Sequence, residues 1–356
     1  MNPTSFIIKN PMINDNIGIY KCKKKIYFNE LHEIQSQARS YINKCFFWNK
    51  LKMKNENNLY NKKNDSNNII KLDICSRSYL KLIEMCQKFD LCQEKNINYL
   101  AIAEAPGGFI EAFIKLRKNK FMGRNDNIVT ISLIDKNNDV PKYIFKNKHN
   151  FNIKIFKGVK NNGDLYDIDN IISINEVLDE KYDFITADGG LDFSTNYNNQ
   201  EELIFKLLFI EMITAFIYLK KDGTFILKVF DILNQNTIEL IYIISIFFKK
   251  VVVYKPFLSR NSNSEKYLIC TNFKGITTKQ IDKLKVIYKI IQENDISQYS
   301  FINKLPNIYI QKIYEYNKYI IGEQIKNIFK TILEVNNYIN ILNNFNWCKL
   351  YLQHYD

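Results

Sequence analysis

An apolar run that stops abruptly at a glycine turn constrains the fold of this chain more than any other feature. Residues 99–103 are apolar, Glu104 to Gly108 read E-A-P-G-G, and an amphipathic run begins at Phe109. This order predicts a buried strand, a tight turn and a helix. Adjacent glycines let the backbone approach a ligand closely, and the start of a helix points free N–H groups at it. The turn is either an ordinary strand-to-helix connection or the cradle of a nucleotide-type cofactor.

Apolar strands and amphipathic helices alternate through the middle of the chain. The pattern predicts further strands at residues 128–134, 152–156, 182–187, 224–230, 250–255 and 265–272, with helices at 77–89, 109–118, 201–219 and 236–248. Such alternation indicates βαβ units and a mainly parallel sheet. Only residues 256–264 join the last two strands, which leaves no room for a crossover helix, so these strands must pair antiparallel. We therefore expect an α/β, Rossmann-like sheet, mostly parallel, with one antiparallel strand near its edge.

The two ends of the chain differ from this regular middle. Residues 1–68 contain a basic run, a helical stretch and an Asn- and Lys-rich loop, whereas the pattern from about residue 275 onward is helical throughout. We expect a basic N-terminal extension over 1–68, an α/β domain over 69–274 and a helical C-terminal extension over 275–356.

A surplus of positive charge narrows the class of partner. The chain has 50 Lys and Arg residues against 37 Asp and Glu, a net charge of +13. This favours a polyanion such as nucleic acid, although a general enrichment in lysine would also produce it. Seven cysteines without a C-x-x-C pair and three histidines indicate reduced thiols and no metal site. Without a signal peptide or an apolar run of about 18 residues, we expect an intracellular, cytoplasmic protein with no membrane segment.

Polar residues follow several of the predicted strands. Ligands of doubly wound sheets bind beyond the carboxyl ends of the strands, and Glu104, Asp135 and Asp188 each stand at such an end. Lys228 lies inside the strand T-F-I-L-K-V-F, where a lysine must be paired or desolvated unless the strand is an edge facing solvent. Burial lowers the pKa of a lysine and carboxylates raise it, so a tuned lysine can act as a general base near pH 7.

Segments in one fixed order across residues 76–272 resemble the motifs of the FtsJ-type family of RNA ribose 2'-O-methyltransferases, which includes cap-specific members. They are S-R-S-Y-L-K-L (76–82), A-P-G-G-F (105–109), D-G-G (188–190), G-T-F-I-L-K (223–228) and K-P-F-L-S-R-N-S-N-S-E-K-Y-L-I (255–269). The resemblance places the family's catalytic tetrad on Lys81, Asp188, Lys228 and Glu265. It implies that Lys228 is the base or orients the 2'-hydroxyl, that the two acids hold Lys228, and that Lys81 lowers its pKa.

The same resemblance implies S-adenosylmethionine (SAM) as the cofactor. The residues that it assigns to SAM binding are Glu104, Ala105, Pro106, Gly107, Gly108, Phe109, Asp135, Asp164 and Asp188. Asp135 would hold the ribose hydroxyls and Asp164 the adenine. The chain departs from many relatives at Ala101, where they have Asp, and instead has Glu104 inside the turn, a variant typical of cap-specific and large-virus-like members.

The implied function is SAM-dependent 2'-O-methylation of the first transcribed nucleotide of capped mRNA, with a capping-machinery protein as a further partner. Three alternatives stay open. One is methylation of ribosomal or transfer RNA, and another is a catalytically inactive RNA-binding or scaffold subunit. The third is a dehydrogenase on a similar sheet, which the absence of G-x-G-x-x-G disfavours.

Overall fold

The computed structural model describes residues 5–8, 17–22, 25–45, 48, 74–120, 125–134, 140–144, 151–177, 180–191 and 197–336. The strands described are β1 (Ser5–Ile8), β2 (Ile17–Lys21), β3 (Asn98–Ile102), β4 (Asn127–Ile131), β5 (Asn152–Phe156), β6 (Tyr182–Ala187), β7 (Leu219–Val229), β8 (Phe248–Tyr254), β9 (Lys266–Phe273) and β10 (Tyr299–Ile302). The α-helices described are α1 (Asn29–Lys44), α3 (Ser78–Lys88), α4 (Gly108–Lys120), α5 (Ile168–Ile172), α6 (Gln200–Tyr218), α7 (Gln235–Phe247), α8 (Thr278–Glu293) and α9 (Asn307–Asn336).

One mixed sheet forms the centre of the described structure, with its strands in the order β1-β8-β9-β7-β6-β3-β4-β5. The strands β7, β6, β3, β4 and β5 run parallel to one another. β9 pairs antiparallel with both β7 and β8. This arrangement confirms the expected mostly parallel sheet with an antiparallel strand near its edge. A short strand that the sequence pattern does not predict, β1, pairs antiparallel with β8 and forms the edge itself.

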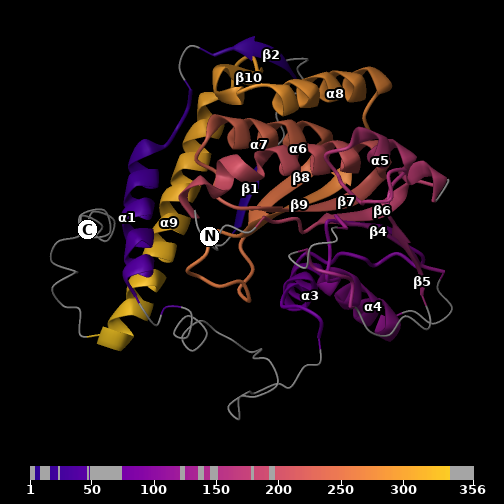
Figure 1. The fold of residues 1–356 in the computed structure, drawn as a ribbon, viewed down its shortest axis with the longest axis horizontal. Coiled ribbons are helices and arrows are strands. Elements are labelled where there is room, and N and C mark those ends of the chain that lie inside the picture. The colour runs from indigo at the N-terminus through magenta and orange to yellow at the C-terminus, as the bar shows by residue number, and fades with distance from the viewer. Residues whose placement is uncertain are drawn as a thin grey trace.

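Helices cover both faces of the sheet (Figure 1). α3 and α4 lie on one face, and α6 and α7 lie on the other. Strand residues alternate between these layers: Tyr99 and Ala101 belong to the core under α3 and α4, whereas Leu100 and Ile102 belong to the core under α6 and α7. All four are fully buried, because a parallel sheet that is covered on two sides needs apolar residues at successive positions.

Segments from near both ends of the sequence pack together on this domain. β2 pairs antiparallel with β10, and the pair lies with α8 outside α6 and α7 (Figure 1). α1 and α9 lie side by side and share one apolar cluster that includes Leu31 and Phe329. The prediction that residues 275–356 are helical throughout is therefore wrong at β10, because pairing with the distant strand β2 overrides the local helical pattern. Residues 53–68 and 337–356 lie outside the described residues.

α6 is buried on almost every side. It lies between the sheet and α8, and its buried residues include the acids Glu201 and Glu211. A helix that is apolar all round is typical of a protein interior or a membrane span. Among the described residues, however, no helix combines the length and the apolar character that crossing a membrane requires.

Candidate active site

Lys228 and Asp188 meet at the carboxyl ends of two neighbouring parallel strands. Lys228 lies near the end of β7 and Asp188 directly follows β6. The Lys228 Nζ donates a hydrogen bond to the Asp188 backbone carbonyl at 2.7 Å and lies 3.3 Å from the carboxylate oxygen Oδ1. A Cβ at Gly190 would come within 3.3 Å of the same nitrogen, so the second glycine of D-G-G lets the lysine lie against the turn. The predicted strand lysine is thus paired and faces away from bulk solvent.

Lys81 and Glu265 form a second ion pair beside the first. The Lys81 Nζ, from α3, lies 2.6 Å from the Glu265 Oε1, and both side chains are 12% exposed. Glu265 directly precedes β9, the strand that pairs with β7. Ser259 Oγ also donates to the Glu265 Oε1, at 3.0 Å. The four residues that the resemblance assigns to a catalytic tetrad therefore lie in two neighbouring pairs.

Tyr267 connects the two ion pairs, although it is not among the site residues predicted from the sequence. It stands opposite Lys228 in the β7–β9 register. Its hydroxyl donates to the Asp188 Oδ1 at 2.9 Å, and the Lys81 Nζ lies 5.9 Å from the centre of its ring. The E-K-Y sequence could have indicated this role. Its tyrosine stands two residues after Glu265, and so on the same side of an extended strand.

Glu84 holds α3 to the loop that carries Glu265. Its carboxylate accepts the backbone N–H of Phe257 at 2.7 Å and that of Leu258 at 3.0 Å, and it also accepts the Tyr254 hydroxyl. Glu84 lies one helical turn after Lys81, so this contact also fixes the lysine. No local motif marks Glu84, because its role depends on a loop about 170 residues away in the sequence.

The charges of Lys228 and Glu265 support each other. Burial acts to lower the pKa of Lys228, but Asp188, Glu265 and Glu211 together outweigh it and raise that pKa above its usual value. Burial likewise acts to raise the pKa of Glu265, but Lys81 and then Lys228 lower it to about 2. Both groups are therefore charged at neutral pH. The expectation of a lysine that is often neutral near pH 7 does not hold for the free protein, because the carboxylates outweigh burial.

A buried acid, Glu211, lies behind the D-G-G turn. It comes from α6, it is 1% exposed, and no side chain within the described part of the chain donates a hydrogen bond to either of its carboxyl oxygens. A Cβ at Gly189 would lie 2.3 Å from the Glu211 Oε1, so only glycine leaves room for this side chain. Burial, with a smaller contribution from Asp188, raises the pKa of Glu211 to about 8. The sequence signal for this residue is a glutamate in the middle of a strongly apolar helix.

The glycine turn after β3 has a backbone conformation and a close helix contact that favour glycine at both positions. Gly107 has φ +112°, a conformation that favours glycine. A Cβ at Gly108 would lie 2.0 Å from Ser78 Oγ and 2.1 Å from Ser76 Oγ, so this glycine allows α4 to start against α3. Glu104 is 3% exposed, and its Oε1 accepts the Thr186 hydroxyl at 2.9 Å.

Among the residues that the structure describes, no side chain donates a hydrogen bond to the second oxygen of Glu104. Burial first, and then the charge of Asp188, raises the pKa of Glu104 well above its usual value. This carboxyl therefore faces the turn and Asp188 without a cation to balance it fully.

The loop that carries Asp164 lies against the end of β4. Gly163 has φ +63°, and a Cβ there would lie 1.9 Å from the Ser132 carbonyl oxygen. The Asp164 Oδ1 accepts the Tyr166 N–H at 2.8 Å, which stabilises the turn itself. Asp135, the other acid that the resemblance assigns to cofactor binding, lies outside the described residues.

Comparison with known proteins relates this site to a family. Residues 74–273 match the family described as FtsJ-like methyltransferase. The cap-specific mRNA (nucleoside-2'-O-)-methyltransferase of Autographa californica nuclear polyhedrosis virus is 32% identical over 196 residues, which cover 55% of this chain and 71% of that protein. The cap-specific mRNA (nucleoside-2'-O-)-methyltransferase 2 of Drosophila melanogaster is 27% identical over 224 residues, 59% of this chain and 31% of that protein.

The corresponding enzyme 2 of Mus musculus is 29% identical over 217 residues, covering 58% of this chain and 28% of that protein. The matched region thus spans less than a third of the two animal relatives. The family match covers more than half of the present sequence and includes both ion pairs and the glycine turn. The chain belongs to the FtsJ-like methyltransferase family.

Proposed function

We propose that this protein transfers the methyl group of SAM to a ribose 2'-hydroxyl of RNA, on the first transcribed nucleotide of capped mRNA. The observation that supports it most directly is the pairing of Lys228 with Asp188 and of Lys81 with Glu265 at the carboxyl ends of the central strands. The relatives named as cap-specific 2'-O-methyltransferases support the choice of capped mRNA.

The residues of the glycine turn fit SAM. SAM carries a sulfonium and an ammonium group, and a cation bound beside the buried Glu104 carboxyl would oppose the rise of its pKa and favour its ionised form. Gly107 and Gly108 leave the backbone open to close approach at the start of α4, where free N–H groups suit a carboxylate. Bound there, SAM would supply an activated methyl group, so that the protein has only to position the hydroxyl and manage its proton.

The tetrad residues suit that task. As an ammonium, Lys228 donates a hydrogen bond to the 2'-hydroxyl oxygen and orients it. To accept the hydroxyl proton, Lys228 must first lose its own, and a positive charge bound nearby would favour that loss by lowering its pKa. Asp188 holds the lysine through direct contacts, Glu265 supports the charge of the lysine from its own pair with Lys81, and Tyr267 keeps the two pairs together.

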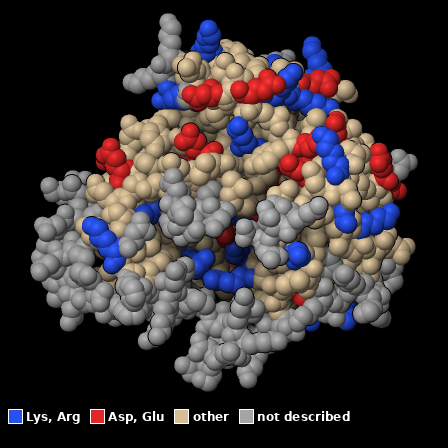
Figure 2. Space-filling model, in the orientation of Figure 1, with Lys and Arg blue, Asp and Glu red and all other residues tan. Residues whose placement is uncertain are grey.

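The surface charge agrees with an RNA substrate. In the space-filling view, Lys and Arg side chains lie in and below a hollow in the lower middle of the face, and Asp or Glu atoms are visible inside it (Figure 2). Positive charge at such a hollow attracts the phosphates of a nucleic acid.

We also propose that the methyltransferase domain spans residues 69–274, flanked by extensions over 1–68 and 275–356. A capping-machinery protein is a further proposed partner.

Replacing Lys228 tests this assignment. Lys228→Ala should lower the rate of labelled methyl transfer to capped RNA by at least about a hundredfold, the usual contribution of a positioned acid–base group, with SAM binding retained. Lys221→Ala is the matched control, because Lys221 is an exposed lysine of the same strand. Substantial turnover by Lys228→Ala would reject the assignment. Failure of the wild-type protein to methylate any RNA would reject the function.

A further inference from the structure

A pocket beside the tetrad has part of its wall outside the family match. The pocket has a volume of about 250 Å³ and is lined by Lys228 and Glu265 on one side. Arg39 and Ile42 of α1, Trp48, and Gln324 of α9 line it on the other. These four residues lie outside 74–273, the part of the chain that matches the family. The added helices therefore contribute to a cavity that opens onto the candidate catalytic lysine.

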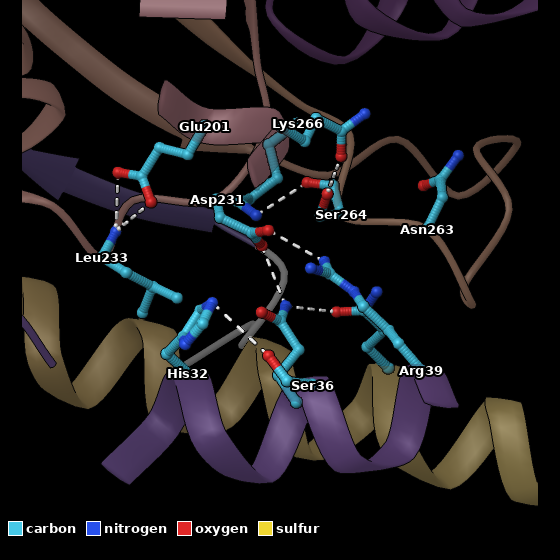
Figure 3. Close-up of polar contacts among 12 residues, drawn as sticks. His32, Ser36, Arg39, Glu201, Asp231, Leu233, Asn263, Ser264 and Lys266 are labelled. Carbon is cyan, nitrogen blue, oxygen red and sulfur yellow. Dashed lines mark hydrogen bonds and ion pairs between the residues drawn. The ribbon is translucent and has the colours of Figure 1, made fainter. Parts of the chain in front are cut away.

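A buried polar network fixes this wall to the strand that carries Lys228 (Figure 3). The Arg39 guanidinium lies 2.8 Å from the carboxylate of Asp231, which comes three residues after Lys228. Gln35 donates to Asp231 at 2.9 Å and to the Gln324 side-chain oxygen at 2.8 Å. Gln324 in turn donates to the Ser262 carbonyl at 2.9 Å.

The network holds charge where burial would oppose it. Burial acts to raise the pKa of Asp231, but Arg39 and then Lys266 outweigh it and lower that pKa, so the carboxyl is ionised. Figure 3 shows Arg39 rising from α1 toward Asp231, with Lys266 on the far side of the same carboxylate. Removing Arg39 would leave Asp231 buried without its main partner, so this pair stabilises the attachment of α1 to the segment after β7.

The lining has the chemistry of a nucleotide site. Arg260 supplies a guanidinium, and Trp48 and Phe230, each 9% exposed, supply the edges of largely buried aromatic rings. The Gln324 amide, which is bonded to Gln35 and Ser262, holds this side of the pocket in place. Single-stranded RNA is recognised by stacking of its bases on aromatic or guanidinium planes and by hydrogen bonds to their edges. Arginine also binds the phosphates. The nucleotide seated here would be the one whose ribose reaches Lys228.

We propose that this pocket binds the acceptor nucleotide of the RNA, so that α1, Trp48 and α9 form part of the substrate site of the enzyme. This inference depends on the proposed function. It assigns RNA recognition to helices that the family match does not include.

Filling the pocket tests the inference. Ile42→Trp adds bulk at its wall and should raise the KM for a short capped RNA by about tenfold, comparable to the loss of one base–aromatic contact, with the SAM dissociation constant unchanged. Gln37→Trp places the same bulk on the exposed side of α1 and should leave KM unchanged. An unchanged KM in a folded Ile42→Trp would overturn the inference while leaving the proposed function intact.

Photocrosslinking gives a second test that needs no variant. The probe is a short capped RNA with 4-thiouridine at its first transcribed nucleotide, irradiated with the full chain and mapped by peptide mass spectrometry. We expect crosslinks in residues 35–48 or 320–328. Crosslinks confined to other segments, such as the lysine-bearing stretch 151–160, would contradict the pocket assignment. Absence of RNA methylation by the wild type would instead count against the proposed function.

Discussion

Glu211 carries a proton that the fold imposes on it. Burial raises its pKa to about 8, and the groups that face it are Asp188, which adds to the shift, and Lys228, which opposes it. At pH 7 the Glu211 carboxyl is therefore mainly neutral, and it lies against Gly189 of the D-G-G turn. A neutral acid at this position leaves Asp188 and Glu265 as the acids that balance Lys228.

The folding stability should report this proton. The folded pKa of Glu211 lies above the ordinary value of 4.5, so the folded state holds the extra proton between about pH 4.5 and 8. The free energy of unfolding then falls as pH rises through that window, by up to about 1.4 kcal/mol per pH unit for one proton. Glu211→Gln cannot titrate, so it should gain stability relative to the wild type between pH 5 and pH 8.

Urea unfolding at pH 5, 6.5 and 8 measures the effect. Glu202→Gln, an exposed neighbour on α6, is the control and should track the wild type. Parallel pH dependence in the wild type and Glu211→Gln would mean that the buried carboxyl does not hold the proton.

Single residues of the site were predictable only where a motif marks them. Lys81, Asp188, Lys228 and Glu265 could be named from sequence because each stands in a recognisable segment. The charge state of Lys228 could not be named from sequence, since its pKa depends on how closely three carboxyls approach it. Glu84 was missed for the same reason, because its partners belong to a distant loop.

At the scale of elements, the junction of α3 and α4 controls the geometry of the turn. Gly108 is the first residue of α4, and Ser76 and Ser78 lie where its Cβ would be. Because α3 also carries Lys81, a shift of either helix would disturb both the glycine turn and the second ion pair.

Gly108→Ala should therefore cost stability and weaken SAM binding. Overpacking of this kind typically costs about 1–3 kcal/mol. Gly322→Ala is the matched control, because Gly322 lies within α9 and a Cβ there would meet no atom within 4 Å. That substitution should stabilise the protein by up to about 1 kcal/mol. Thermal unfolding and calorimetric titration with SAM measure both, and equal behaviour of the two variants would contradict the packing argument.

The long buried strands were predictable and the short edge strands were not. Runs such as residues 99–103 are apolar at each position, which marks a strand that is covered on both faces. β1, β2 and β10 have four or five residues each, and their partners are distant in the sequence. No local pattern predicts such pairing, and β10 follows a helix in a segment with a helical pattern.

At the scale of the whole molecule, the ends of the chain complete the core and one wall of the candidate site. Residues of β2, α8 and α9 join the same apolar cluster as the sheet and α6. The Arg39–Asp231 pair is one polar contact between these segments and the domain, with side chains 6% and 5% exposed. Because Asp231 follows the strand that carries Lys228, this pair connects the extensions to the candidate active site.

Breaking this pair should destabilise the protein far more than breaking a surface pair of equal length. Arg39→Ala leaves Asp231 buried without its main partner and should cost about 3–5 kcal/mol. Lys249→Ala removes a pair with Asp222 that has the same 2.8 Å separation but is 58% and 53% exposed, and it should cost less than about 1 kcal/mol. Denaturant unfolding compares them, and similar costs would show that α1 is not anchored as the structure indicates.

The position of the transferred methyl group is the most direct test of the central claim. Capped, uncapped and ribosomal RNA would each be incubated with the protein and SAM, digested with nuclease and examined by mass spectrometry. We expect a methyl group on the ribose 2'-oxygen of the first transcribed nucleotide of the capped RNA. A methyl group on a base, methylation of ribosomal RNA alone, or no methylation by a protein that binds SAM would contradict it.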